Sequence, residues 1–484
     1  MTGFRRRFAP LDIFSMNEVS RMEDGLMTVL EETGVRMDHA RGLEVLAGAG
    51  CRVDKADNRV RIPSSLVRKC LGLCPKVFPV RARDPKNDLL LGGDTLYFVS
   101  GCGMQTVNPT TGEARPATQE EVVTGIRVLD GLDNLHIHMA FSPYFGWDGL
   151  PPVMGEPEMT AAKARNSTKV QKTGSTNDSE VFAIKMARAL GCEILGLVNP
   201  SPPLTWYPEA AEALFRYCEA RMPFHISSGA TMGLTGPASI AGATITNSAE
   251  IMAGIVLAQL VSPGARVWVG NFVNAANMAT GSIAFGSIGN SLTQLAFNQL
   301  WRRYGIPMWS ATPAYSSARR IDFQLGYEKG IAAILAGIAG SNAIHMHGGI
   351  HAELTWHPLQ AVLDDDLAGI VGRAVEGAEV SDESLALELI RRVGPIPGHY
   401  IEEEHTANAW RALEYMPKAA DRRSAHEWEA GGRKGALEIA HERMERILST
   451  HVPVRLSATQ DAAIDDILRE ARSYYAQKGL CPQA

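Results

Sequence analysis

Eight short apolar runs recur between Leu96 and His347, and helical stretches separate most of them. Each run ends in a small or polar turn. Parallel strands need crossovers of about a dozen or more residues, usually helical, and eight such units close into a barrel. The expected strands cover residues 96–99, 135–140, 169–173, 194–198, 223–227, 266–269, 307–310 and 343–347. The sequence therefore predicts an α/β fold, a TIM (β/α)8 barrel, with its functional site on the loops that follow the strands.

The chain has 484 residues, which leaves room for a module on each side of a barrel. Apolar residues at helical spacing over 15–34 and a hairpin pattern over 51–62 predict an N-terminal α/β cap. Beyond Trp356 the chain turns polar and helical. We expect a cap over 1–92, the barrel over 93–356, and a helical extension over 357–484.

Composition restricts the class of protein and its location. The net charge is -6 and 45% of residues are hydrophobic, so a large core is expected and no basic surface for nucleic acid. Seven cysteines show no zinc-like or disulfide-like spacing. Arg5, Arg6 and Arg7 precede no apolar segment that would make a secretory signal. We expect a cytoplasmic protein.

One predicted helix is long and apolar enough to cross a membrane. It covers about 237–261 and contains Asn247, Glu250 and Gln259. Three polar groups within one span are costly in lipid, so a buried barrel helix is the expectation.

Two His-x-His pairs, His136 with His138 and His345 with His347, lie on predicted strands. Strand alternation puts each pair on one face. With His351, the second pair makes a three-histidine candidate for zinc in a metal-dependent barrel hydrolase. The other strand ends are neutral, and such a site also needs a carboxylate or lysine there. A hydrolase that uses His345 and His347 remains an alternative, while His136 and His138 fit a buried structural role.

Aromatic residues gather after the predicted strands, although they make up only 7% of the chain. Aromatic faces attract a quaternary ammonium, which can donate no ordinary hydrogen bond. The alternative is that some rings only close the barrel core. The residues concerned are Phe141, Tyr144, Phe145, Trp147, Trp206, Tyr207, Phe272, Trp309 and Tyr315.

Two further motifs lie near the same loops. Gly348 and Gly349 follow the eighth strand, where barrels often bind phosphate, but no lysine is near in sequence. Asp322 and Glu328 open the helix between strands seven and eight, where acidic residues also suit helix capping. A sugar-phosphate enzyme is a further alternative, although glycines at this position usually serve the backbone geometry of the turn.

The chain resembles the trimethylamine methyltransferase family along nearly its full length. No single motif is specific, but their order and spacing together are. They are Leu30-Glu-Glu-Thr-Gly34, Ala49-Gly50, Val60-Arg-Ile-Pro63, Gly236-Pro-Ala-Ser-Ile-Ala-Gly242, Asn247-Ser-Ala-Glu250, Gln259-Leu260, Pro263-Gly264, the Asp322-x-Gln324-x-x-x-Glu328 motif, His405-Thr406, Pro417, Asp421-Arg422 and Trp428.

The resemblance implies a barrel in a homo-oligomer built partly through the terminal helices. It also implies methyl transfer from an amine to the corrinoid of a partner protein. The chain holds only standard residues, so it is similar to the subgroup that lacks pyrrolysine and demethylates quaternary amines such as glycine betaine. A quaternary nitrogen is an activated leaving group. Cobalt(I) of the partner can therefore attack the methyl directly, without a catalytic residue or metal in this chain. Tetrahydrofolate is an alternative acceptor.

We expect the residues at the strand ends to bind the quaternary amine. Rings would bind the ammonium, and His345 or His347 would meet a substrate carboxylate or orient a ring. The expected substrate-binding residues are Phe141, Tyr144, Trp147, Trp309, Tyr315, Asp322, His345 and His347.

Overall fold

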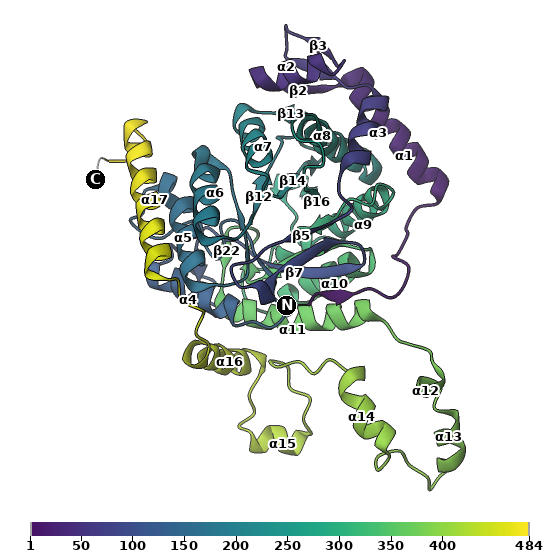
Figure 1. Cartoon of the computed structure of the whole chain (residues 1–484). Helices are drawn as coiled ribbons and strands as arrows, with labels where there is room; N and C mark the ends of the chain where they lie inside the picture. The colour runs from purple at the N-terminus through teal and green to yellow at the C-terminus, as the bar shows by residue number, and fades with distance from the viewer. Residues whose placement is uncertain (1, 483–484) are drawn as a thin grey trace.

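The computed structural model describes residues 2–482, and its centre is a closed sheet of eight parallel strands within a ring of helices (Figure 1). The strands follow one another around the barrel in chain order, and β7 pairs with β20 to close it. They are β7 (Thr95–Ser100), β10 (Ile137–His138), β11 (Val170–Thr173), β12 (Ile194–Val198), β14 (Phe224–Ser228), β16 (Val267–Asn271), β19 (Met308–Ser310) and β20 (Ala343–His347). The predicted barrel is confirmed.

The alternation of side chains along the strands builds two cores. On β20, Ala343 packs inside the barrel, while Ile344 and Met346 pack outward against helices. The ring consists of α4 (Gln119–Asp130), α5 (Gly155–Asn166), α6 (Ser179–Leu190), α7 (Pro208–Ala220), α8 (Ile240–Val261), α9 (Ile288–Arg302), α10 (Phe323–Ile338) and α11 (Pro358–Glu376). Helix α11 occupies the eighth position, between α10 and α4.

Helix α8 is apolar on all sides because the N-terminal cap covers its outer face. Among residues 2–482 it is the one helix long and apolar enough to cross a membrane, and 72% of its most apolar window is buried. Its polar side chains are used inside the protein. The Asn247 amide donates to Asn271, and Gln259 donates to the Ala265 carbonyl and accepts from the Gly264 amide. The helix is thus a core element of the barrel.

The cap combines helices with a small sheet. Strands β3 and β4 form the predicted antiparallel hairpin, and β13, from the loop after β12, joins the same sheet through β2. The cap is therefore tied to a loop at the open end of the barrel. Its elements are α1 (Met16–Thr28), β2 (Val35–Met37), α2 (Ala40–Gly48), β3 (Arg52–Asp54), β4 (Arg59–Arg61) and α3 (Ser64–Leu73), with β13 (Thr205–Trp206).

A second hairpin closes the opposite end of the barrel. Strands β5 (Val77–Val80) and β6 (Leu89–Gly92) pair with each other and send Phe78 and Leu91 into the interior core. The Arg81 backbone is held by Glu193, which precedes β12. The bottom of the barrel is therefore filled, and the carboxyl ends of the strands are left as the open mouth. At β1 (Phe4–Arg5), the N-terminus adds a short antiparallel strand to β7.

Short strands in the loops shape the mouth. They are β8 (Thr106–Val107) with β9 (Ala114–Arg115), β15 (Thr231–Met232) with β17 (Asn274–Asn277) and β18 (Ser282–Ile283), and β21 (Gly349–Ile350) with β22 (Thr355–Trp356). The β21–β22 hairpin follows β20 directly, so it carries residues from the last barrel strand over the opening.

The C-terminal segment returns to the barrel through two long helices. Helix α16 (Ala436–Thr450) packs on α11 and α4, where Arg443 pairs with the buried Asp365 at 2.6 Å. Helix α17 (Ala458–Gln477) packs on α6 and α5. Between α11 and α16 lies a segment, 377–435, much of which stands away from the barrel in Figure 1. Its residues Lys418 and Ala419 return to the barrel, where their amides donate to Asp366 on α11. The segment holds α12 (Asp382–Leu385), α13 (Leu387–Val393), α14 (Glu404–Leu413) and α15 (Ala425–Ala430).

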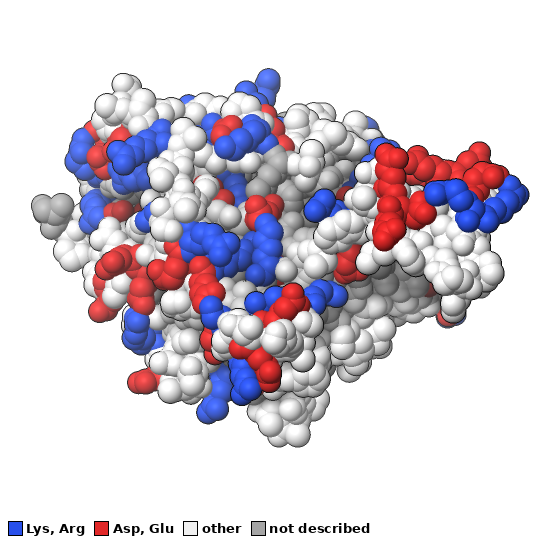
Figure 2. Space-filling model, turned by 90° about the horizontal axis from the view of Figure 1, so that it is seen from below, with Lys and Arg blue, Asp and Glu red and all other residues white. Residues whose placement is uncertain are grey.

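Seen from below, basic and acidic side chains are interspersed over the surface (Figure 2).

Candidate active site

The mouth of the barrel contains a cavity of about 290 Å³, which we call the inner cavity. It is built by the ends of strands and the residues directly after them. Its lining comprises Cys102, Met139, Phe141, Leu197, Asn199, Pro200, Pro202, Ser227, Ser228, Gly229, Phe272, Trp309, Tyr315 and Glu353. No lysine or arginine is in this lining, and Glu353 is its one carboxylate.

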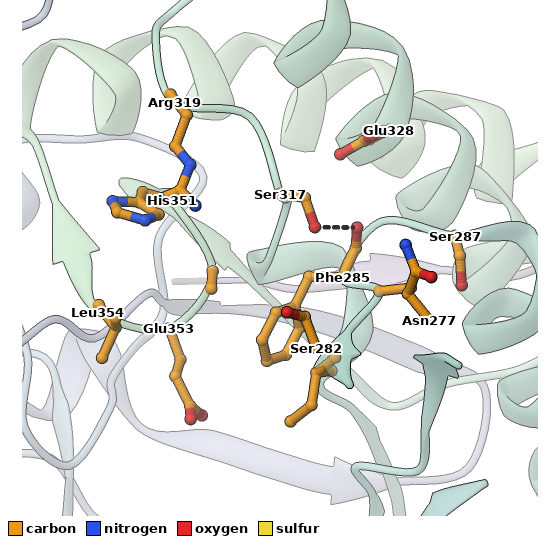
Figure 3. A pocket seen from close by; sticks show the side chains of 13 residues that line it. Asn277, Ser282, Phe285, Ser287, Ser317, Arg319, Glu328, His351, Glu353 and Leu354 are labelled. Carbon is orange, nitrogen blue, oxygen red and sulfur yellow. Dashed lines mark hydrogen bonds between the residues drawn. The ribbon is translucent and has the colours of Figure 1, made fainter. Parts of the chain in front are cut away.

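A larger hollow of about 640 Å³, the outer cavity, lies among the loops beyond the strand ends (Figure 3). Its walls come from the β17–β18 loop, the start of α10 and the β21–β22 hairpin. The lining comprises Asn277, Ser282, Ile283, Ala284, Phe285, Ser287, Ser317, Arg319, Glu328, His351, Ala352, Glu353 and Leu354. Glu353 lines both cavities, so the two adjoin at this side chain.

Aromatic rings form much of the inner cavity. Tyr315 packs against Phe272 with ring centroids 5.3 Å apart, and Trp309 belongs to the same interior core. Trp309 and Tyr315 are only 3% and 4% exposed, so their rings are fixed by packing. The Tyr315 hydroxyl lies 3.4 Å from the Cys102 thiol, and burial raises the pKa of both groups, that of Cys102 to about 11. Both side chains are therefore neutral at neutral pH.

Phe141 reaches the cavity from a strained position after β10. Its φ is 60°, a left-handed conformation that costs a bulky residue about 1–2 kcal/mol. A side chain at Gly174 would lie 2.7 Å from the Phe141 ring, so this glycine provides the space that the ring occupies. Strain of this kind persists where the surrounding structure holds it, which is common in binding sites.

A buried polar layer lies beneath the rings. The Lys172 amine is 2.6 Å from Nδ1 of His225 and 4.3 Å from the centre of the Trp309 ring. His345 packs on Trp309 and Tyr315, with both centroid distances 5.2 Å. Burial holds the pKa of Lys172 and of His345 well below their usual ranges. Within residues 2–482, no carboxylate forms an ion pair with the Lys172 amine. The layer therefore places little positive charge under the cavity.

The structure brings together some of the predicted substrate-binding residues. Phe141, Trp309 and Tyr315 line the inner cavity, and His345 lies behind two of these rings. Tyr144 instead packs edge-on against Trp356, and its hydroxyl donates to the Trp356 carbonyl. Trp147 packs against the same cluster, on the side of α4 and α11. These two residues support the loops and do not line either cavity.

His345 and His347 do not share a strand face, contrary to the simple alternation expected for β20. The pairing register with β7 shifts between them. His345 therefore points into the barrel, while Nε2 of His347 lies 3.5 Å from Asp365 on α11. His351 lines the outer cavity, so the three histidines of the hydrolase alternative do not meet. Within residues 2–482, no group of three or more His, Cys, Asp or Glu side chains could hold a metal ion.

The acidic motif at the start of α10 is divided between two places. Asp322 caps α10 by accepting the Leu325 amide at 3.3 Å, and it lines neither cavity. Glu328 lines the outer cavity, where its carboxylate accepts hydrogen bonds from Ser316 and from Gln324. His136 and His138 are buried in the barrel wall, bonded to the Phe98 amide and to Ser167 respectively.

Glu353 is a site residue that the sequence pattern does not reveal. The strand ends are neutral, as predicted, but the β21–β22 hairpin folds back and brings the Glu353 carboxylate to the cavity. A glutamate soon after two glycines at the end of the last strand was the available signal. Nothing in the local pattern shows that the loop returns over the mouth.

Glu250 is a second buried carboxyl group at the edge of the site. It accepts a hydrogen bond from Ser228, which lines the inner cavity, and one from the Leu204 amide at 2.7 Å. Burial raises the pKa of Glu250 to about 7. This carboxyl is therefore partly protonated at neutral pH.

Replacing Glu250 with glutamine should stabilise the fold at pH 8 and have little effect at pH 4. Folding raises the pKa of Glu250 from 4.5 to about 7, so the folded state retains a proton that the unfolded chain releases above pH 4.5. Stability therefore falls as pH rises through this window, by about 3 kcal/mol at its end. Urea unfolding at both pH values measures the difference. The exposed Glu44→Gln serves as control, and a stability gap independent of pH would contradict the assignment.

Both the sequence and the fold of the chain are similar to those of known proteins. The sequence model of a family described as trimethylamine methyltransferase matches residues 1–474. The glycine betaine methyltransferase of Desulfitobacterium hafniense strain Y51 is 27% identical over 482 residues, covering 97% of each chain. The trimethylamine methyltransferase MttB of D. hafniense strain DCB-2 is 28% identical over 472 residues, covering 96% of this chain and 94% of the relative.

A solved structure shows the same fold. The crystal structure of the hydroxylamine complex of MtmB aligns with a TM-score of 0.50 and 11% sequence identity. The alignment covers 90% of this chain and 93% of that protein. The two proteins thus share their fold at low sequence identity.

Proposed function

Because the chain belongs to the trimethylamine methyltransferase family and is a methyltransferase, we propose that it demethylates a quaternary amine and passes the methyl to the corrinoid of a partner protein. The similarity to a glycine betaine methyltransferase supports a glycine betaine-like donor. The similarity to trimethylamine methyltransferases supports a methylated amine in general. The choice of a quaternary amine rests on the resemblance to the subgroup without pyrrolysine and on the aromatic lining of the inner cavity.

The observation that carries the proposal is the chemistry of the inner cavity. Phe141, Phe272, Trp309 and Tyr315 present rings to it, and no lysine or arginine lines it. A quaternary ammonium group has no N–H to donate, so aromatic faces and a nearby carboxylate are its best protein partners.

The residues of the chain bind and orient the donor. The ammonium packs on Trp309 and Tyr315, and the methyl to be transferred faces the outer cavity. The corrinoid supplies a strong cobalt(I) nucleophile for that methyl. The C–N bond breaks with its electron pair left on nitrogen, so the amine departs neutral and no protein acid is required. Holding the methyl in line and excluding water are the contributions expected of the protein.

The neutral side chains in the cavity protect the transferred methyl. Cys102 is the one thiol in the lining, and its pKa of about 11 keeps it protonated at neutral pH. Tyr315 is likewise held as a neutral phenol by burial, which raises its pKa. Neither group competes as a nucleophile for the methyl, because thiolate and phenolate are the reactive forms.

Fewer features of the structure bear on the methyl acceptor than on the methyl donor. The outer cavity leaves the barrel open on the face where a corrinoid protein would approach, and tetrahydrofolate is the alternative acceptor for the same opening. We propose the corrinoid because the donor needs no activation when the nucleophile is cobalt(I). This chain is not expected to contribute a metal of its own.

We also propose a cytoplasmic homo-oligomer. All seven cysteines are free, which suits a reducing compartment. Large apolar side chains are exposed on the segment 377–435, among them Val380, Ile396 and Ile401, each at least 81% exposed. Short helices without buried residues, such as α12, α13 and α15, are marginal alone and gain stability against another surface. A second copy of the chain would supply that surface.

The donor and the acceptor can be tested in one assay. Wild-type protein is incubated with glycine betaine, γ-butyrobetaine, choline, trimethylamine or dimethylamine, each with reduced cobalamin or with tetrahydrofolate. We expect at least one quaternary amine to lose one methyl when reduced cobalamin is present, and trimethylamine and dimethylamine to remain unchanged. Product amines are measured by mass spectrometry. Demethylation of trimethylamine alone would contradict the proposed donor class, and transfer only to tetrahydrofolate would contradict the acceptor.

A further inference from the structure

Glu353 occupies the junction of the two cavities. It lies between β21 and β22, at the end of the hairpin, and it lines the inner and the outer cavity. Among the described residues, its carboxylate has no hydrogen bond or ion pair with another side chain. It is open to the water of the cavities, yet the surrounding protein raises its pKa above the usual range. An unpaired carboxylate beside four aromatic rings is a binding partner for a cation.

The hairpin that carries Glu353 is held rigidly. The two residues before it, His351 and Ala352, have φ values of 53° and 61°, which are left-handed. Their amides donate to the carbonyls of Ala318 and Ser316 at 3.0 and 2.6 Å. Non-glycine residues in this conformation are uncommon and cost energy, so they indicate that the surrounding structure fixes the turn. The carboxylate is therefore presented to the cavities from a defined backbone.

Arg319 provides the opposite charge. It is the one lysine or arginine in the lining of the outer cavity, and no ion pair or hydrogen bond from its guanidinium to another described side chain is present. His351 lies next to it in Figure 3, and burial together with Arg319 lowers the pKa of that histidine, which favours its neutral form. Glu328 also lines this cavity but already accepts two hydrogen bonds from Ser316 and Gln324. The free charges are thus Arg319 and Glu353.

The two free charges point to different parts of the site. In Figure 3 the Glu353 side chain extends away from Arg319, and the His351 turn lies between them. Arg319 does not line the inner cavity. A ligand whose cation lies on the rings beside Glu353 must therefore extend into the outer cavity before an anionic group can reach Arg319.

We propose that these cavities recognise the two ends of one zwitterion: Glu353 pairs with the quaternary ammonium, and Arg319 pairs with a carboxylate several bonds away. This inference rests on the proposed function and names its substrate class. The donor is a betaine with a spacer between nitrogen and carboxylate, and a shorter betaine such as glycine betaine makes the contact with Glu353 but reaches Arg319 poorly. Both residues position the substrate, and neither takes part in breaking the C–N bond.

The contributions of Glu353 and Arg319 can be measured separately, because one donor has a carboxylate and the other has none. Glu353→Gln and Arg319→Gln are assayed with γ-butyrobetaine and with tetramethylammonium, which has no carboxylate, using reduced cobalamin as acceptor. Glu353→Gln should raise the KM for both donors by about fivefold or more, the effect of one partly solvated charge pair. Arg319→Gln should raise the KM for γ-butyrobetaine by a similar factor and leave that for tetramethylammonium unchanged. In the wild type, γ-butyrobetaine should have a lower KM than glycine betaine.

Matched controls use the same substitutions outside the cavities. Arg320→Gln changes the neighbouring exposed arginine, and Glu120→Gln changes an exposed carboxylate near the start of α4. Both should retain wild-type KM values, and thermal unfolding should show that all four variants are folded. Equal KM values in wild type and Glu353→Gln would overturn the assignment of Glu353. A change in the tetramethylammonium KM in Arg319→Gln would overturn that of Arg319, as would an unchanged γ-butyrobetaine KM.

Failure of the inference can be distinguished from failure of the proposed function. If the wild type demethylates no quaternary amine, the proposed function is wrong, and equilibrium binding of tetramethylammonium, measured by calorimetry, then tests Glu353 alone. If the wild type demethylates quaternary amines but prefers glycine betaine over γ-butyrobetaine, the function stands and the spacer is contradicted.

Discussion

Replacing Trp309 with leucine should raise the KM for a quaternary amine about thirtyfold. A desolvated cation–π contact contributes about 2 kcal/mol, and tryptophan is the strongest aromatic partner for a cation. Trp309 is 3% exposed and lines the inner cavity, so water does not replace the lost contact at low cost. Steady-state methyl transfer from a quaternary amine to reduced cobalamin measures the effect.

Two further variants separate this effect from damage to the core. Trp309→Phe retains an aromatic face and should recover part of the lost affinity. Trp268→Leu alters the other tryptophan near Lys172. The Trp268 ring centre lies 5.4 Å from the Lys172 amine, and Trp268 lines neither cavity. That variant should lower the melting temperature and keep a KM close to wild type. If Trp309→Leu binds donors as well as Trp309→Phe does, the aromatic contact is not what holds the ammonium.

Replacing Lys329 with methionine should destabilise the protein by about 3–5 kcal/mol, the usual cost of leaving one partner of a buried ion pair uncompensated. Lys329 and Asp364 are fully buried and lie 2.5 Å apart. The lysine also donates to the carbonyls of Met346 and Gly349, and Asp364 accepts the Gly348 amide. This pair therefore fixes the turn from β20 into the hairpin that carries Glu353. Urea unfolding measures the loss.

A double variant tests the cause of that loss. Lys329→Met combined with Asp364→Leu removes the uncompensated charge and should recover part of the stability. The recovery should be incomplete, because the backbone groups of the turn lose their partners. Below its melting temperature, Lys329→Met should also have a raised KM for quaternary amines. A melting temperature equal to that of the wild type would show that the pair does not stabilise the fold.

The barrel can be predicted from the sequence because its pattern is local and repeated. A buried parallel strand leaves an apolar run of few residues. Helix α4 is preceded by its N-cap Thr118, which forms a capping box with Glu121. The helix 240–261 reads as a membrane candidate by composition alone, and the polar residues within it indicate a buried helix instead. The cap over its outer face explains why it is apolar all round.

The site is less predictable because side-chain direction at the mouth depends on loops. Trp309 and Tyr315 follow from their position at a strand end. Tyr144 has the same kind of position, but its loop turns it toward Trp356. His347 leaves the face of His345 because of a register shift that strand alternation does not contain. Glu353 reaches the cavity through a hairpin, and the sequence pattern does not show where such a loop folds.

The stoichiometry of a single turnover tests the proposed methyl transfer most directly. Excess wild-type protein is mixed with a methyl-labelled quaternary amine and reduced cobalamin, and both products are quantified over time. We expect one tertiary amine for each labelled methyl found on cobalamin, and a slower reaction of Trp309→Leu at the same low donor concentration. Tertiary amine formed without label on cobalamin, or no demethylation of any quaternary donor, would contradict the proposed methyl transfer.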